Sequence, residues 1–223
     1  MHIALLCLSV FIIAASTTFG APPEPMNDDQ KTTYALGLAI SQSLSAFNLN
    51  ESELEFVKAG LADGVLKRQR KVDVQAFLPK IKQLQQARAT VVAEAEKKAA
   101  ASFVAKAAAE PRTTKTESGI LITTIKPGKG ASPKATDTVK VHYQGTLIDG
   151  TVFDSSVQRG EPVSFPLGNV IKCWTEGLQQ MKVGGKSRLI CPPDLAYGDR
   201  GSEPNIKPGA TLVFEVELLD ITK

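Results

Sequence analysis

Two segments near the start of the chain carry apolar side chains at helical spacing. The apolar positions are Leu36, Ile40, Leu44 and Phe47 in the first segment and Leu54, Val57, Leu61 and Val65 in the second. A repeat of three or four residues places these side chains on one face of an α-helix. Asn27 with Gln30, and Asn50 with Glu53, have the separation of a capping box and predict the two helix starts. So short a hairpin cannot bury both stripes alone, which favours pairing with a second copy of the same helices.

A third segment continues the helical spacing without a glycine as far as Ala109. Its apolar positions are Phe77, Ile81, Leu84, Val91 and Ala95, and Asp73 can cap its start. Pro79 either kinks this helix or marks its true start. At 1.5 Å per residue the helix is about 45–50 Å long, which is the length of a spacer. From Val92 to Ala109 alanine, lysine and glutamate dominate, so this part is expected to cross solvent; the alternative is a disordered linker, which the helix propensity of alanine disfavours.

After Pro111 short β-type segments alternate with glycine, proline and aspartate. Asp149-Gly150 predicts a hairpin turn between Val139–Leu147 and Thr151–Phe153. Alternation of apolar and other residues predicts a last strand with one buried face, formed by Leu212, Phe214, Val216 and Leu218 against Val213, Glu215 and Glu217. Between these strands only Thr175 to Met181 has helical character. The fold class is therefore α+β, with an all-α arm, a long linker helix, and an antiparallel sheet wrapped around one short helix.

The first twenty residues have a different pattern, with an apolar run from Ile3 to Ala15 followed by mostly small residues to Gly20. This pattern predicts a secretory signal peptide cleaved after Gly20. The run is too short to span a bilayer comfortably, and no later run is longer, so we expect no integral membrane segment in the mature chain. The predicted domains are a signal peptide (1–20), a helical dimerisation domain (21–72), a linker helix (73–110) and a β-rich domain (111–223).

Charge and cysteine content narrow the function classes. The 26 basic and 23 acidic residues leave a net charge of +3, too small and too dispersed to indicate nucleic-acid binding. One basic run, Lys67 to Lys71, is interpreted as a solvated interhelical turn, with a membrane or acidic-partner contact as the alternative. Cys7 leaves with the signal peptide, and the remaining pair, Cys173 and Cys191, suggests a disulfide in an exported protein, with two free thiols as the alternative.

Five blocks of the β-rich domain match one known family in order and spacing. They are Val141-His142-Tyr143, Asp149 to Ser156, Val170 to Trp174, Ala196-Tyr197-Gly198 and Ala210 to Phe214. From Ser118 to Ile221 the chain resembles the FKBP family of peptidyl-prolyl cis/trans isomerases. The helical arm resembles, by its layout, that of the bacterial macrophage-infectivity-potentiator and FkpA-like proteins.

The resemblance implies rotation about Xaa–Pro imide bonds, whose planarity costs about 18–20 kcal/mol to break. No covalent bond changes, so neither a nucleophile nor a metal nor a cofactor is required. The residues implied as catalytic are Asp154, Tyr197 and Tyr143. Those implied as substrate-binding are Phe153, Val170, Ile171, Trp174, Ile206, Phe214, Arg159 and Val163. Trp174 is expected to form the pocket floor, Tyr197 and the Ile171 amide to bind substrate carbonyls, and Asp154 to act electrostatically, braced by Tyr143 and Arg159.

Each of these roles has an alternative. Without the matching blocks, the aromatic residues would be interpreted as core packing. Val163 stands where many family members have an aromatic side chain, and Ser202–Ile206 departs from the glycine-containing loop of many relatives, which leaves macrolide affinity open. A Cys173–His142 hydrolase is disfavoured, because no oxyanion or orienting residues accompany the pair.

The expected function is a foldase for proline-containing unfolded or nascent exported polypeptides, with chaperone activity from the helical arm. The alternative is a holdase chaperone with a weak or vestigial pocket. The resemblance further implies a homodimer, a tacrolimus- or rapamycin-type ligand, and a location in the periplasm or at the outer membrane after secretion across the inner membrane.

Overall fold

The computed structural model describes residues 26–202 and 204–222. By its internal contacts the chain divides into two units, Met1–Ala39 and Ile40–Lys223. The signal peptide predicted over residues 1–20 lies outside the described residues, and the three boundaries between the four predicted segments stay a prediction. Within the described ranges, no helix is long and apolar enough to cross a membrane.

Two helices occupy the segments in which the apolar stripes were found, α1 (Asp28–Gln42) and α2 (Glu51–Val65), and a short 3-10 turn, η1 (Ser45–Phe47), comes between them in sequence. Both predicted capping boxes are confirmed. The Gln30 amide donates to Asn27 Oδ1 and the Asn27 amide to Gln30 Oε1, each at 2.9 Å. Asn50 and Glu53 exchange the same pair of bonds at 2.9 and 3.0 Å. Neither helix has a buried residue, and five residues of the apolar stripes are exposed: Leu36, Ile40, Leu54, Leu61 and Val65. Leu44, Phe47 and Val57 are half-buried, and Leu44 and Phe47 lie beyond the end of α1, so the first stripe is not all on one helix as predicted.

The long helix α3 extends from Val74 to Ala108. The Asp73 side chain accepts from the Gln75 amide at 3.0 Å, as its predicted capping role requires. Pro79 lies inside the helix, so it does not mark the start. The alternative of a disordered linker is wrong, because the segment is one helix of 35 residues.

The C-terminal half of α3 packs against the β domain, so the prediction that it crosses solvent is wrong. Ala93, Ala100 and Ala107, seven residues apart, are each at most 3% exposed. Further along the helix, Phe103 and Val104 pack with Ala107 over three residues of the sheet, Leu121, Ile190 and Val213. The close packing is possible because alanine side chains are small and let the helix approach its neighbour closely. A stripe of small residues therefore indicates a packed face as well as it indicates a solvated one.

The contact between α3 and Gly209 predicts a stability effect. Gly209 has φ +72°, and a Cβ there would lie 2.5 Å from Ala93 Cα. Gly184 also has positive φ, +83°, but has no atom within 4 Å of a Cβ. We expect Gly209→Ala to lower the free energy of unfolding by roughly 2–4 kcal/mol, and Gly184→Ala by about 1 kcal/mol from backbone strain alone. Urea titrations followed by tryptophan fluorescence measure both, and equal losses would contradict the contact.

The C-terminal region forms one antiparallel sheet of seven strands. The strands are β1 (Thr113–Lys115), β2 (Leu121–Lys126), β3 (Thr138–Leu147), β4 (Val152–Ser155), β5 (Val163–Pro166), β6 (Lys186–Cys191) and β7 (Leu212–Thr222). Their order is β1-β2-β6-β7-β3-β4, and β5 pairs with β3. The predicted hairpin is confirmed, since Gly150 takes φ +89° in the turn between β3 and β4.

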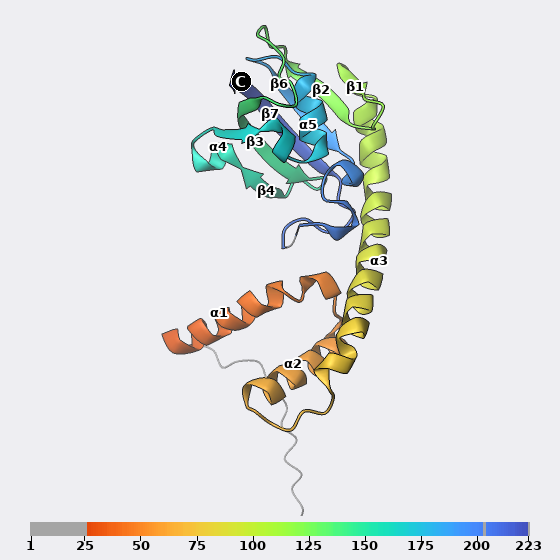
Figure 1. Cartoon of the computed structure of the whole chain (residues 1–223), viewed down its shortest axis with the longest axis vertical. Coiled ribbons are helices and arrows are strands. Elements are labelled where there is room, and N and C mark those ends of the chain that lie inside the picture. The colour runs from red at the N-terminus through yellow and green to blue at the C-terminus, as the bar shows by residue number, and fades with distance from the viewer. Residues whose placement is uncertain (1–25, 203, 223) are drawn as a thin grey trace, which may run out of the picture. The chain divides into compact units, whose positions relative to one another are not determined.

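One helix, α5 (Lys172–Gln179), lies across one face of this sheet (Figure 1). It begins three residues before the predicted Thr175, and it buries Cys173, Trp174 and Leu178. A second short helix, α4 (Ser156–Arg159), was not predicted. The alternation in β7 holds except at Val213, which is 8% exposed because α3 covers it from the other face. The aromatic residues gather in the core between α5 and the sheet.

Candidate active site

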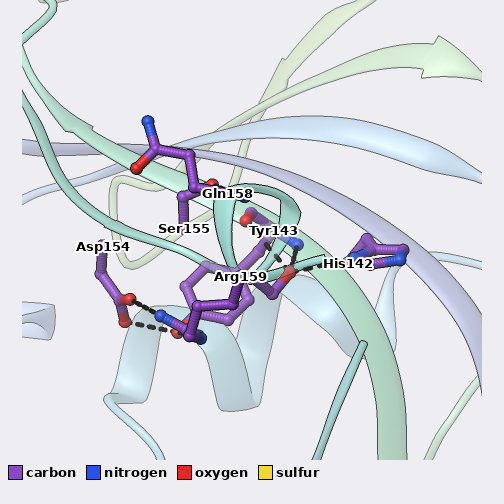
Figure 2. Close-up of polar contacts among 7 residues, drawn as sticks. His142, Tyr143, Asp154, Ser155, Gln158 and Arg159 are labelled. Carbon is purple, nitrogen blue, oxygen red and sulfur yellow. Dashed lines mark hydrogen bonds and ion pairs between the residues drawn. The ribbon is translucent and has the colours of Figure 1, made fainter. Parts of the chain in front are cut away.

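Three polar side chains, from β3, β4 and the last residue of α4, form a closed cluster. The Tyr143 hydroxyl donates to Asp154 Oδ2, and Arg159 Nη1 donates to Asp154 Oδ1. Arg159 Nη2 also donates to the Tyr143 hydroxyl oxygen at 3.1 Å. Figure 2 shows the Asp154 carboxylate facing both the Arg159 guanidinium and the Tyr143 hydroxyl. The three residues come from β3, β4 and α4, so the β3–β4 hairpin and the turn after it assemble the cluster.

This cluster shifts the pKa values of its members. Partial burial disfavours the charged form of Asp154, but hydrogen bonds from Tyr143 and Arg159 outweigh it and lower the pKa of that carboxyl. Burial, and then the bond to Asp154, raise the pKa of the Tyr143 hydroxyl. Arg159 has a raised pKa because of its bond to Asp154. Asp154 is therefore an anion and Tyr143 a neutral donor near neutral pH.

A flat pH profile follows from these directions. With the pKa of Asp154 lowered and that of Tyr143 raised, neither group changes its charge between about pH 5 and pH 9. The stabilisation that Asp154 contributes is complete above its unfolded-state pKa and is lost only as the pH falls through its lower folded-state pKa. We expect the rate constant of any reaction at this cluster to be constant over this range. A step near neutrality that persists in a His142→Gln variant would contradict the assignment.

Ser156, on α4, bonds to the backbone of β3 next to the cluster. Its hydroxyl oxygen accepts from the Tyr143 amide at 2.8 Å, lies 3.2 Å from the Tyr143 carbonyl oxygen, and is 3.1 Å from His142 Nδ1. The side chain is fully buried. This bonding fixes α4 to β3, and it gives His142 a structural contact in place of a catalytic one.

A cavity of about 380 Å³ opens beside the polar cluster. Ten residues line it: Tyr143, Phe153, Asp154, Phe165, Asn169, Val170, Ile171, Trp174, Tyr197 and Phe214. Trp174 is 4% exposed, and Tyr143, Phe165 and Phe214 meet its indole edge to face with centroids 5.1, 5.8 and 5.3 Å away. The cavity is thus a ring-lined hollow with one carboxylate at its side, suited to a small apolar ring that carries polar amide neighbours.

Most of the residues predicted for the site lie together in this cavity, and three lie outside its lining. Arg159 touches it only through Asp154 and Tyr143. Ile206, 5% exposed, belongs to the core cluster behind the rings. Val163 packs against the same cluster from β5.

The sequence reasoning missed Phe165, Asn169 and Gly145. Phe165 lies two residues after Val163 on the same strand, so the alternation of a strand was the available signal. A Cβ on Gly145 would lie 2.6 Å from the Phe153 ring and 3.0 Å from the Phe214 ring. This glycine in mid-strand therefore makes room for two walls of the cavity. Nothing in the pattern singles out Asn169.

Cys173 and Cys191 are joined by a disulfide with their Cα atoms 5.6 Å apart. Both residues are fully buried. The bond ties the first turn of α5 to the end of β6, next to Trp174. At a sequence separation of 18 residues, the chain-entropy model gives a stabilisation of about 3 kcal/mol. A sulfur in this bond is no nucleophile, which removes the Cys173–His142 hydrolase.

Two family models match the chain. Residues 129–219 match the model described as FKBP-type peptidyl-prolyl cis-trans isomerase. Residues 29–122 match the model described as the domain amino terminal to FKBP-type peptidyl-prolyl isomerase.

Individual proteins show the same similarity. The chain is 42% identical over 197 residues to the FKBP-type 22 kDa peptidyl-prolyl cis-trans isomerase of Escherichia coli (strain K12), covering 86% of this chain and 95% of the relative. It is 56% identical over 106 residues to FK506-binding protein 1 of Rhizopus delemar, covering 46% and 98%. The crystal structure of FkpA from Escherichia coli matches with a TM-score of 0.65 at 39% identity, covering 88% of this chain and 97% of that one.

Proposed function

Because this chain belongs to the FKBP-type peptidyl-prolyl cis-trans isomerases, we propose that its ring-lined cavity binds a prolyl residue and eases the twist of the preceding imide bond. The observation that carries the proposal is the set of aromatic rings around Trp174 with an ionised carboxylate at the edge. The isomerase activity comes with the family. The role of each residue is our proposal.

The cavity walls favour the twisted imide over the planar one. A planar imide is more polar than a twisted one, so a dry aromatic site destabilises the ground state relative to the transition state. Trp174 forms the floor beneath the prolyl ring, and Phe153, Val170, Ile171 and Phe214 form walls. Phe165 joins them, and Val163 and Ile206 support them from behind.

Two donors hold the substrate backbone. The Tyr197 hydroxyl donates to one substrate carbonyl, and its ring lines the cavity. The Ile171 amide donates to another. Ile171 is the N-cap of α5, and no acceptor for its N–H appears among the backbone bonds of the described residues. Fixing the carbonyls on either side of the prolyl ring leaves the imide as the bond that rotates.

Asp154 acts by its charge and transfers no proton. Its carboxylate, oriented by Tyr143 and Arg159, lies at the cavity edge. There it interacts with the carbonyl that loses conjugation as the imide twists. Arg159 and Tyr143 keep it ionised and in place.

We assign the protein to the periplasm or the outer membrane, where proline-containing exported polypeptides fold.

The helical arm supplies chaperone activity and a homodimer interface. Support for the dimer comes from the uncovered stripes, in which Leu36 is 60% exposed and Leu61 44% exposed, and from the match to the amino-terminal domain model. The double variant Leu36→Glu/Ile40→Glu should halve the mass measured by light scattering, whereas Gln42→Glu should leave it unchanged.

A macrolide of the tacrolimus or rapamycin type is proposed to bind in the same cavity. Support comes from the 56% identity to a relative named FK506-binding protein 1. The test is isomerisation of a prolyl tetrapeptide by the full-length protein with and without macrolide. Acceleration that the macrolide abolishes supports the proposal, and acceleration that it leaves unchanged contradicts it.

The second candidate function is a holdase with a vestigial pocket, which the exposed apolar stripes of α1 and α2 favour. If the full-length protein suppresses aggregation of an unfolded client but does not accelerate the tetrapeptide, the holdase function holds. The Asp154→Leu variant separates the two activities, since it should lose isomerisation and keep the suppression.

A further inference from the structure

A groove runs from the edge of the prolyl cavity along helix α3. Its first hollow, about 650 Å³, is lined by Gln85 of α3, by Ala46 of η1, and by Ala196, Tyr197 and Arg200 to Ser202 on the loop side. A second hollow of about 380 Å³ shares Ala46, Gln85 and Arg200 with the first and continues to Ala89. We call these two hollows together the helix groove.

Tyr197 connects the helix groove to the prolyl cavity. Tyr197 lines the prolyl cavity and the first hollow of the groove, and it is 40% exposed. The prolyl cavity measures only about 380 Å³, so the chain of a longer substrate has to leave it at one side. The route past Tyr197 leads into the groove.

The walls of the groove are held together by charge pairs and close packing. Lys97 Nζ lies 2.9 Å from Asp199 Oδ1, and Lys207 Nζ lies 3.3 Å from Glu96 Oε1. About one turn earlier on α3, Ala93 packs directly against the backbone of Gly209. Gln85 and Ala89 lie on the same helix one to two turns before Ala93, so the docking of α3 fixes their distance from the loop. The groove is therefore a formed surface and not a chance gap between segments.

The chemistry of the groove favours an acidic segment. Arg200 is exposed, and among residues 26–202 and 204–222 it has no ion pair. The neighbouring carboxylate, Asp199, is already engaged by Lys97. Gln85 has no side-chain hydrogen bond within these residues either, so its amide is available to an extended backbone. A guanidinium presents five N–H donors in one plane, and it binds a carboxylate in preference to other side chains.

We infer that the helix groove binds the part of the substrate polypeptide that flanks the prolyl residue, and that Arg200 makes it select segments with Asp or Glu. This inference rests on the proposed function of the cavity. It assigns to α3 a second role, as one wall of an extended substrate site.

The test compares a prolyl tetrapeptide with longer peptides that share its core. Each longer peptide extends the core on one side by residues that contain either two Glu or two Lys. For the full-length wild-type protein at low salt, we expect kcat/KM for the Glu peptide to exceed that for the Lys peptide by about two- to fivefold on the side that enters the groove. Added salt should reduce the difference, because the pair is exposed.

Two variants and one control sharpen the result. Arg200→Glu should reverse the preference and leave tetrapeptide turnover unchanged. Ala89→Trp should fill the groove and reduce both longer peptides to the tetrapeptide rate. Lys140→Glu makes the same charge change on an exposed position of β3, and it should keep the wild-type preference.

The outcomes separate the two proposals. The inference about the groove is overturned if tetrapeptide turnover is normal and neither side shows a charge preference. It is also overturned if Arg200→Glu leaves the preference unchanged. Absence of tetrapeptide turnover in the wild-type protein overturns the proposed function of the cavity itself.

Discussion

Replacing Asp154 with leucine is expected to lower kcat/KM for a prolyl tetrapeptide by roughly tenfold to a hundredfold. Leucine keeps the approximate size of the side chain and removes the charge at the cavity edge. It also leaves the Tyr143 hydroxyl and the Arg159 guanidinium without their shared acceptor. The assay is protease-coupled or NMR-monitored isomerisation at low temperature, where the uncatalysed rate is slow.

The fold should survive this substitution. The Asp154 side chain is 40% exposed and that of Arg159 46% exposed, so solvent already screens most of their attraction. Glu161→Leu removes an exposed carboxylate outside the cluster and should leave both rate and stability unchanged. A wild-type rate in a folded Asp154→Leu protein would remove the electrostatic role that we propose.

Replacing Trp174 with alanine is expected to have the largest effect on stability, a loss of about 3–5 kcal/mol in the free energy of unfolding. The indole is 4% exposed and meets three other rings edge to face. Its removal leaves a void in the core cluster and also takes away the floor of the cavity. Isomerisation should fall with it even at temperatures where the variant remains folded.

Urea titration followed by far-ultraviolet circular dichroism measures this loss, because the variant has no other tryptophan. Trp174→Phe serves as the matched control. It keeps an aromatic floor of smaller area, so it should lose less stability and retain part of the activity. If Trp174→Ala were as stable as the wild type, the indole would not be packed as described.

Local signals in the sequence predicted the helix starts and the hairpin well. The capping boxes at Asn27 and Asn50, and the turn at Gly150, depend on side chains and φ angles within three residues of each other. Such features need no knowledge of the rest of the chain. The site residues were predicted for a different reason, because they belong to five blocks whose order and spacing resemble a family. Residues between the blocks have no such match and were not predicted.

The errors came from contacts between distant segments. Alanine at positions 93, 100 and 107 predicts a helix, but it does not reveal that the sheet covers those positions. For the same reason Val213 was expected to face solvent, although α3 buries it. Phe165 lies outside the five matching blocks, so only its alternation with Val163 on the same strand could have indicated it. The seven-residue spacing of the alanines was the available signal for the docked helix.

The central claim, that a prolyl ring sits on the indole of Trp174, has a direct test in the ¹H–¹⁵N correlation spectrum. The chain contains one tryptophan, so its single indole N–H signal needs no assignment. Titration with a prolyl tetrapeptide should shift this signal in a saturable way and give intermolecular nuclear Overhauser effects to the proline ring. A peptide with alanine in place of proline should do neither. An indole signal that stays in place while the protein turns the prolyl peptide over would contradict the account.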